Sequence, residues 1–184
     1  MAAGAIDSPY VAAFFENLLP EGEQRRLISL RELATLEQSA VDRLQLLRWL
    51  FFNLCAGNND SHAKNLSMVA TAGGLRLAPF YDLMCTRVYA GLGTHFAFTL
   101  AGESEPGKLG PAHIAALAKE LGVAPRYLQG VAVDMAKKVK IAIPAAAAEI
   151  LPGLAPGDRI LTERLVQKIA SLSNKMQNRL VHIL

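Results

Sequence analysis

Between Gly57 and Asp82 the sequence concentrates polar residues whose types and spacing could do chemistry. Asp60 is followed five positions later by Asn65, in a turn rich in Gly and Asn that comes directly after an apolar segment. A protein-kinase catalytic loop places an Asp and an Asn at this spacing, so that the Asp takes a hydroxyl proton while the Asn holds a metal ion. The pattern therefore predicts a general base at Asp60 beside a metal ligand at Asn65.

A second carboxylate, Asp82, follows a segment that has the pattern of a β-hairpin. Residues 66–70 and 75–78 are short apolar-rich runs, and the Gly-containing residues 71–74 between them suit a tight turn. Because paired strands lie about 4.8 Å apart, the open end of the hairpin would bring Asn65 close to the segment that leads to Asp82. Both side chains could then ligate one Mg²⁺ through oxygen, while nucleotide phosphates and water fill its other positions.

At these residues the sequence resembles the HipA family, bacterial serine/threonine kinases that act as the toxin half of toxin-antitoxin pairs. The resemblance covers roughly residues 40–105 and is specific, because it combines a long motif with two spaced metal-ligand positions. The matching segments are Asn-x-Asp-x-His-x-Lys-Asn-x-Ser from Asn58, Pro-x-Tyr-Asp-Leu from Pro79, and the preceding Arg48-Trp49-Leu50-Phe51-Phe52-Asn53.

The resemblance implies a mainly α (α+β) fold, a HipA-like kinase C-lobe that is helical with a short β-hairpin carrying the site. It implies ATP and Mg²⁺ as cofactors and transfer of the ATP γ-phosphate to a serine or threonine of a protein. The implied partners are a helix-turn-helix antitoxin and a protein substrate, for which the family suggests an aminoacyl-tRNA synthetase. The implied site residues are Asp60 as catalytic base, Asn65 and Asp82 as magnesium ligands, and His62, Lys64 and Tyr81 as nucleotide neighbours.

Two parts of a complete kinase have no counterpart before the catalytic loop. A kinase needs a glycine-rich cover over the phosphates and a strand lysine that contacts them. The sequence before Asn58 has glycines only at positions 4, 22 and 57 and contains no lysine. Residues 14–23 resemble part of the small N-terminal subdomain of HipA proteins, so we expect residues 1–30 to be such a segment and residues 31–184 to be the C-terminal lobe.

The expected absence of a nucleotide-binding N-lobe leaves two interpretations of the chain. It is either an internally shortened or split family member, which the resemblance of residues 14–23 favours, or a fragment of the C-lobe. In both interpretations catalytic activity stays an open question. The alternative to a kinase is then a catalytically inactive remnant that binds an antitoxin or another protein.

Composition excludes several other classes of protein. An apolar content of 52% in 184 residues predicts one folded domain with a core and argues against disorder. The net charge of +3 is too small to predict direct binding of nucleic acid. No signal peptide and no apolar run long enough to span a membrane are evident, so we expect a cytoplasmic protein.

The remaining pattern predicts mostly helices. Apolar residues recur at three- and four-residue spacing in two early segments, and three later segments begin near a proline or an acidic residue. The alternation of Phe96, Phe98 and Leu100 with smaller residues predicts a further strand. The expected helices are 30–36, 39–54, 111–121, 125–140 and 158–182, the expected strand lies within 91–102, and residues 102–110 are a polar connection.

The two cysteines and one short cluster support alternative interpretations. Cys55 and Cys85 each lie near a predicted site residue, but packing is the usual role of a free cysteine, and we expect it here rather than a redox role. His62 has two open roles, because it could contact nucleotide or buttress the loop through hydrogen bonds. A hydrolase metal site is the third alternative, formed by Asn58, Asp60, His62 and Asp82.

Overall fold

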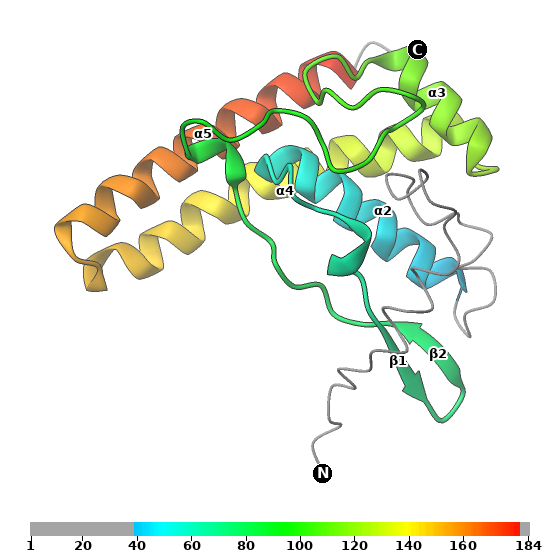
Figure 1. The fold of residues 1–184 in the computed structure, drawn as a ribbon, viewed down its shortest axis with the longest axis horizontal. Coiled ribbons are helices and arrows are strands. Elements are labelled where there is room, and N and C mark those ends of the chain that lie inside the picture. The colour runs from blue at the N-terminus through cyan, green and yellow to red at the C-terminus, as the bar shows by residue number, and fades with distance from the viewer. Residues whose placement is uncertain (1–38, 181–184) are drawn as a thin grey trace.

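A computed structural model describes residues 39–180 of the chain, and Figure 1 shows their arrangement. The structure is mainly helical with one small antiparallel sheet, which confirms the predicted fold class. Three short 3-10 helices, labelled η, join the larger elements. The elements in order are α2 (Ser39–Ala56), η2 (Ala63–Asn65), β1 (Met68–Thr71), β2 (Gly74–Leu77), η3 (Thr86–Val88), α3 (Pro111–Glu120), α4 (Pro125–Ile150), η4 (Leu151–Gly153) and α5 (Pro156–Leu180).

Helix α2 is the centre of the fold. From Leu46 to its end most of its side chains are buried, as expected for a helix segment at the centre of a core. Helices α4 and α5 both pack against it, and they run antiparallel to each other along most of their length (Figure 1). The residues of α2 that are at most 6% exposed include Leu46, Leu47, Trp49, Leu50, Phe51 and Leu54.

Helix α4 presents small residues to its neighbours. Leu128, Ala132 and Ala136 are fully buried and recur every four residues, so they lie on one face of the helix. The small alanines allow close packing of α4 against the helices it contacts, α2 and α5. From α5, Ile169 and Met176 complete this part of the core.

The structure corrects the predicted end of α4. The sequence predicts that this helix covers residues 125–140. The helix instead continues through Pro144 to Ile150. A proline removes only the hydrogen bond that its own nitrogen would donate, here to Lys140 O, and packing of α4 along α5 outweighs that loss. The boundaries of the other predicted helices are confirmed to within two residues where they fall inside residues 39–180, and the predicted end of the last helix at residue 182 lies outside the described residues.

The strand predicted within residues 91–102 is wrong. Within the described residues that segment forms no regular strand; Thr99 and Leu100 are bridge residues, and Leu100 is bridged to Glu103. Its alternating burial is nevertheless real, since Phe96, Phe98 and Leu100 are each at most 5% exposed. The rings of Phe96 and Phe98 stack with their centroids 5.2 Å apart. The apolar alternation thus reflects side chains that anchor this loop to the core, and within residues 39–180 the loop has no partner strand.

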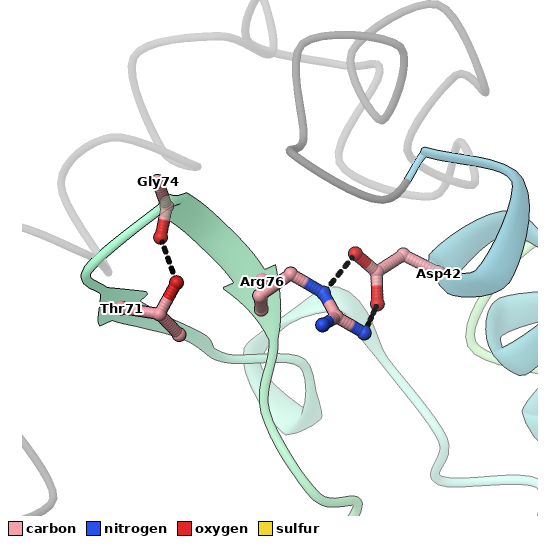
Figure 2. Close-up of polar contacts among 4 residues, drawn as sticks. All are labelled: Asp42, Thr71, Gly74 and Arg76. Carbon is pink, nitrogen blue, oxygen red and sulfur yellow. Dashed lines mark hydrogen bonds and ion pairs between the residues drawn. The ribbon is translucent and has the colours of Figure 1, made fainter.

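The predicted hairpin is confirmed. Strands β1 and β2 pair antiparallel with Met68 opposite Leu77 and Thr71 opposite Gly74, which leaves a two-residue turn between them. Gly74 has a φ of 130°, a conformation that L side chains rarely adopt. Thr71 Oγ1 donates a hydrogen bond of 2.8 Å to Gly74 O and closes the turn (Figure 2).

An ion pair attaches this hairpin to the central helix. Arg76 on β2 donates to both carboxylate oxygens of Asp42 on α2, with Nε to Oδ2 at 2.9 Å and Nη2 to Oδ1 at 3.2 Å (Figure 2). The Asp42 side chain is only 2% exposed and that of Arg76 is 24% exposed. Two parallel hydrogen bonds fix both distance and orientation, so this pair sets how the hairpin leaves the helical body.

The predicted helix at residues 30–36 and the predicted N-terminal segment 1–30 lie outside the described residues. The division of the chain into residues 1–30 and 31–184 therefore stays a prediction. Among the helices within residues 39–180, none is long and apolar enough to cross a membrane.

We predict that Arg76→Met lowers the free energy of unfolding by about 2 to 4 kcal/mol, because it leaves the buried Asp42 carboxylate without its cation. Urea denaturation followed by circular dichroism measures this change. The matched control is Lys138→Met, which breaks an exposed ion pair with Asp134 and should cost at most about 0.5 kcal/mol. Equal losses for the two variants would show that the Asp42 pair does not hold the hairpin in place.

Candidate active site

The candidate site begins where α2 ends. Gly57 follows the helix with a φ of +73°, the left-handed conformation that ends many helices and that favours glycine. The position is also crowded, since a Cβ there would lie 2.5 Å from Leu172 Cδ1 and 2.9 Å from Arg87 Cγ. Backbone conformation and space both require glycine, so the chain turns sharply into the polar segment at a fixed point.

Asn58 holds the first part of this turn. Its side chain is buried, and Nδ2 donates to Asn53 Oδ1 at 2.9 Å and to Asp82 O at 3.0 Å. Its Oδ1 accepts a hydrogen bond of 3.2 Å from the Asp60 backbone nitrogen. One side chain therefore contacts the end of α2, the turn at Asp60 and the segment that follows the hairpin.

Asn65 and Asp82, the two predicted magnesium ligands, are in direct contact. Asn65 Nδ2 donates a hydrogen bond of 2.8 Å to Asp82 Oδ2, and it lies 3.5 Å from the backbone oxygen of Asp60. The hairpin brings them together as the sequence predicts, because Ala78 N donates to Ser67 O and extends the pairing toward its open end. The structure thus places the backbone of Asp60 and the side chains of Asn65 and Asp82 at one point.

Asp82 has an unusual backbone conformation. Its φ is 54°, in the left-handed region that costs a residue other than glycine about 1 to 2 kcal/mol. Two hydrogen bonds hold it there, from Asn65 to its carboxylate and from Asn58 to its carbonyl oxygen. Strained conformations that the surroundings enforce gather at functional sites, and this one fixes the direction of the Asp82 side chain.

A second segment fastens the turn from the other side. Thr86 Oγ1 accepts from Asn59 N at 2.9 Å and donates to Gly57 O at 3.0 Å. The Asn59 side chain also donates through Nδ2 to Gly93 O at 3.0 Å. The backbone oxygen of Asn59 accepts a hydrogen bond of 3.0 Å from Ala97 N. The segment 91–102, which was expected to contain a strand, is therefore hydrogen-bonded to the turn at Asn59.

The Asp60 side chain differs from its neighbours in being exposed. Its carboxylate makes no hydrogen bond to any described residue, whereas its backbone nitrogen and oxygen are both bonded. A general base needs this combination, with a fixed backbone and a carboxylate that is open to an incoming hydroxyl.

The three remaining predicted residues surround this point. Tyr81 is half-exposed and its hydroxyl donates to Lys64 O at 2.6 Å, so it ties together the two segments at the open end of the hairpin. His62 Nδ1 is buried, and within residues 39–180 it has no hydrogen-bond partner. The buttressing role considered for His62 thus finds no such partner in the described part of the chain. Lys64 is exposed.

The chemistry of the donors fits magnesium. Carboxylate and amide oxygens from Asp82 and Asn65 are hard ligands, and two protein ligands leave room for phosphate oxygens and water. Within the described ranges no group of three or more His, Cys, Asp or Glu side chains could hold a metal ion. The amide of Asn58 is occupied by internal hydrogen bonds, so the four-residue hydrolase site lacks one of its expected ligands.

Both cysteines are packed. Burial raises the pKa of the Cys55 thiol from 9.0 to about 12, and burial likewise raises the pKa of Cys85. A raised pKa reduces the thiolate that oxidation and metal binding require. The chemistry of these thiols agrees with packing rather than with a redox role.

The structure is a helical lobe in which a turn and a hairpin bring the backbone of Asp60 to the paired side chains of Asn65 and Asp82. Comparison with known families gives the particular family, because residues 13–143 match the HipA-like C-terminal domain. The chain belongs to this family. The match begins within the N-terminal segment considered above and ends inside α4.

Two curated relatives cover parts of the same region. The serine/threonine-protein kinase toxin HipA of Shewanella oneidensis is 33% identical over 113 residues, which are 61% of this chain and 25% of the relative. A putative kinase, Y4mE of Sinorhizobium fredii, is 36% identical over 84 residues, which are 46% of this chain and 20% of the relative. The matched region is thus a quarter or less of each relative.

A solved structure shares the fold. The chain superposes with a TM-score of 0.73 and 24% identity on a chain from a complex of Shewanella oneidensis MR-1 HipA, HipB and operator DNA. The superposition covers 85% of this chain and 37% of that chain. It confirms the HipA-like fold of the described helices and hairpin.

Sequence reasoning did not find the structural roles of three residues that shape the site, although it considered Asn58 as a ligand of a hydrolase metal site. Asn53 and Asn58 lie within the matched motifs, but their side-chain hydrogen bonds follow only from the way α2 ends. No sequence pattern pointed to Thr86, because it lies far along the chain from the turn at Asn59 and contacts that turn only in the folded protein. Spacing predicts Asn65 and Asp82 as ligands, and tertiary packing supplies the residues that hold these two side chains in place.

We predict that both thiols react more slowly with a thiol reagent in the native protein at pH 8 than in the unfolded chain, and that the Cys55 thiol is slower by about two orders of magnitude or more. The unfolded Cys55 thiol ionises near its ordinary pKa of 9.0, whereas the folded thiol stays protonated up to about pH 12. The stabilising contribution of the protonated Cys55 thiol to the free energy of unfolding is therefore complete below pH 9.0 and is lost as the pH rises toward 12. Rapid native labelling of either thiol would favour a redox role.

Proposed function

We propose that this chain provides the catalytic-loop half of a HipA-like serine/threonine kinase site that transfers phosphate from ATP to a protein hydroxyl. The observation that carries the proposal is the 2.8 Å contact between Asn65 and Asp82. It joins, across a hairpin, the two side chains that the family motif would use for magnesium. Membership of the family and an exposed Asp60 carboxylate support the same assignment.

In this proposal each residue has a distinct task. Asp60 orients the acceptor hydroxyl and takes its proton, while Asn65 and Asp82 hold Mg²⁺, which would neutralise charge on the phosphates. His62 and Lys64 lie within the same turn, where they would contact the nucleotide, and Tyr81 positions Lys64 through its backbone carbonyl. With only two protein ligands, magnesium would bind tightly only together with a nucleotide.

The other half of the site would come from a further polypeptide segment or from a second chain. A glycine-rich phosphate cover and a contacting lysine do not occur in the sequence before Asn58. The matched region is also only a quarter or less of the curated relatives. Full phosphoryl transfer would therefore require this lobe and the complementary part to be present together.

A helix-turn-helix antitoxin is the proposed partner. The structural relative is described as a complex of HipA with HipB and operator DNA, and the shared fold supports an equivalent assembly here. An aminoacyl-tRNA synthetase is the substrate that the family resemblance suggests. The second candidate function is an inactive module that binds such a partner, and it is motivated by the lack of a glycine-rich stretch and of a lysine within residues 1–57.

We predict that the isolated chain binds Mg-ATP with a dissociation constant of about 1 mM or lower, measured by calorimetric titration. Asp82→Asn should abolish this binding, because it removes the carboxylate charge that holds the metal beside Asn65. The matched control is Asp134→Asn on α4, which changes one exposed carboxylate that pairs only with Lys138 and should leave binding unchanged.

Absence of Mg-ATP binding by the folded wild-type chain would contradict the nucleotide half-site. The inactive module would then be favoured if an antitoxin binds this chain and still binds Asp60→Ala and Asp82→Ala variants. Loss of antitoxin binding in well-folded variants of this kind would instead tie the partner surface to the site.

A further inference from the structure

Three segments of the site meet at the side chain of Asn58, to which the family motif assigned no role. We propose that Asn58 is a positioning residue that holds Asp82 and Asp60 in the arrangement needed for Mg-ATP. The proposal deepens the proposed function and rests on it. It follows from the atoms that each hydrogen bond uses.

The amide of Asn58 is used completely. A primary amide has two N–H donors and a carbonyl acceptor. One donor binds Asn53 Oδ1 at 2.9 Å and the other binds Asp82 O at 3.0 Å, while the oxygen accepts from Asp60 N at 3.2 Å. The side chain is 1% exposed, so water cannot replace these contacts at low cost.

Helix α2 sets the direction of this network. Asn53 Nδ2 donates to Trp49 O at 2.9 Å, one turn earlier in the helix. The Asn53 oxygen therefore faces Asn58 and accepts its N–H. Both side chains are buried, so the rigid helix orients Asn53 and Asn53 orients Asn58.

Asp82 depends on this network for its backbone conformation. A φ of 54° is unfavourable for an aspartate, and the Asn58 donor to its carbonyl oxygen is one of the two hydrogen bonds that maintain it. Without that donor, Asp82 can return to a negative φ, which would turn its carboxylate away from Asn65. Asn58 thus acts on the metal through Asp82, without touching the metal or the nucleotide.

The test measures how strongly ATP binding depends on magnesium. For wild type, Asn58→Ala and Asn58→Asp, the dissociation constant of ATP is measured with Mg²⁺ and with EDTA. Both variants should reduce the ratio of the dissociation constant in EDTA to that with Mg²⁺ by about tenfold or more, which is the scale of one neutral hydrogen bond at the strong end of its usual range. Asn58→Asp keeps the side-chain shape and the acceptor for Asp60 but loses both donors, and it serves if the alanine variant does not fold.

A matched control separates positioning from a general loss of stability. Val139→Ala removes buried volume from α4, far along the sequence from the turn, and is expected to lower stability without changing the ratio. A ratio that falls equally in Val139→Ala and in the Asn58 variants would overturn the proposal. A wild-type ratio in either folded Asn58 variant would overturn it as well.

A second measurement does not need nucleotide. The side-chain amide signal of Asn65 in a ¹⁵N spectrum reports its bond to Asp82 Oδ2. This signal should shift in the Asn58 variants and stay in place in Val139→Ala. If wild type binds no Mg-ATP while the signal shifts, the proposed function fails and the positioning role stands. An unchanged Asn65 signal would overturn the positioning role whatever the binding result.

Discussion

The structure depends on the hydrogen bond from Asn65 to Asp82, because it joins the two ends of the hairpin at the point where chemistry is expected. The hairpin and the ion pair that attaches it to α2 bring these two side chains together. The hairpin returns the chain to its starting point, and the ion pair of Arg76 with Asp42 fixes the hairpin to α2 (Figure 2). The amide oxygen of Asn65 and the second carboxylate oxygen of Asp82 are hard donors of the kind that would hold a shared cation.

The rigidity of this contact comes from the helical body. Helix α2 is buried among α4 and α5, so its end cannot move without disturbing the core (Figure 1). Gly57 allows the sharp turn. Asn58 is hydrogen-bonded both to Asn53 near the end of α2 and to Asp82, so it fixes Asp82 relative to the helix. From the opposite side Thr86 binds both Gly57 and Asn59. An exposed Asp60 carboxylate thus stands on a backbone that is fixed from two directions.

Much of this arrangement could be predicted from sequence because it depends on local pattern. The turn glycines and short apolar runs gave the hairpin, and antiparallel pairing then placed Asn65 near Asp82. The loop through Phe96 and Phe98 could not be predicted, because side chains that alternate into a core look the same with or without a partner strand. The continuation of α4 through Pro144 was also hidden, since it depends on packing along α5. Thr86 was missed for the same reason, as only the fold brings it to the turn.

The most direct test of the account is paramagnetic relaxation with Mn²⁺ and ATP in an isotopically labelled chain, with Mg²⁺ and ATP as the diamagnetic reference. Relaxation by a bound Mn²⁺ falls off steeply with distance from the ion. The account predicts that the amide signals of Asn65 and Asp82 broaden first, followed by that of Asp60, while signals from the far end of α4 near Ile150 stay sharp. Broadening centred elsewhere, or sharp signals from the whole turn at saturating Mn²⁺ and ATP, would contradict a metal site at Asn65 and Asp82.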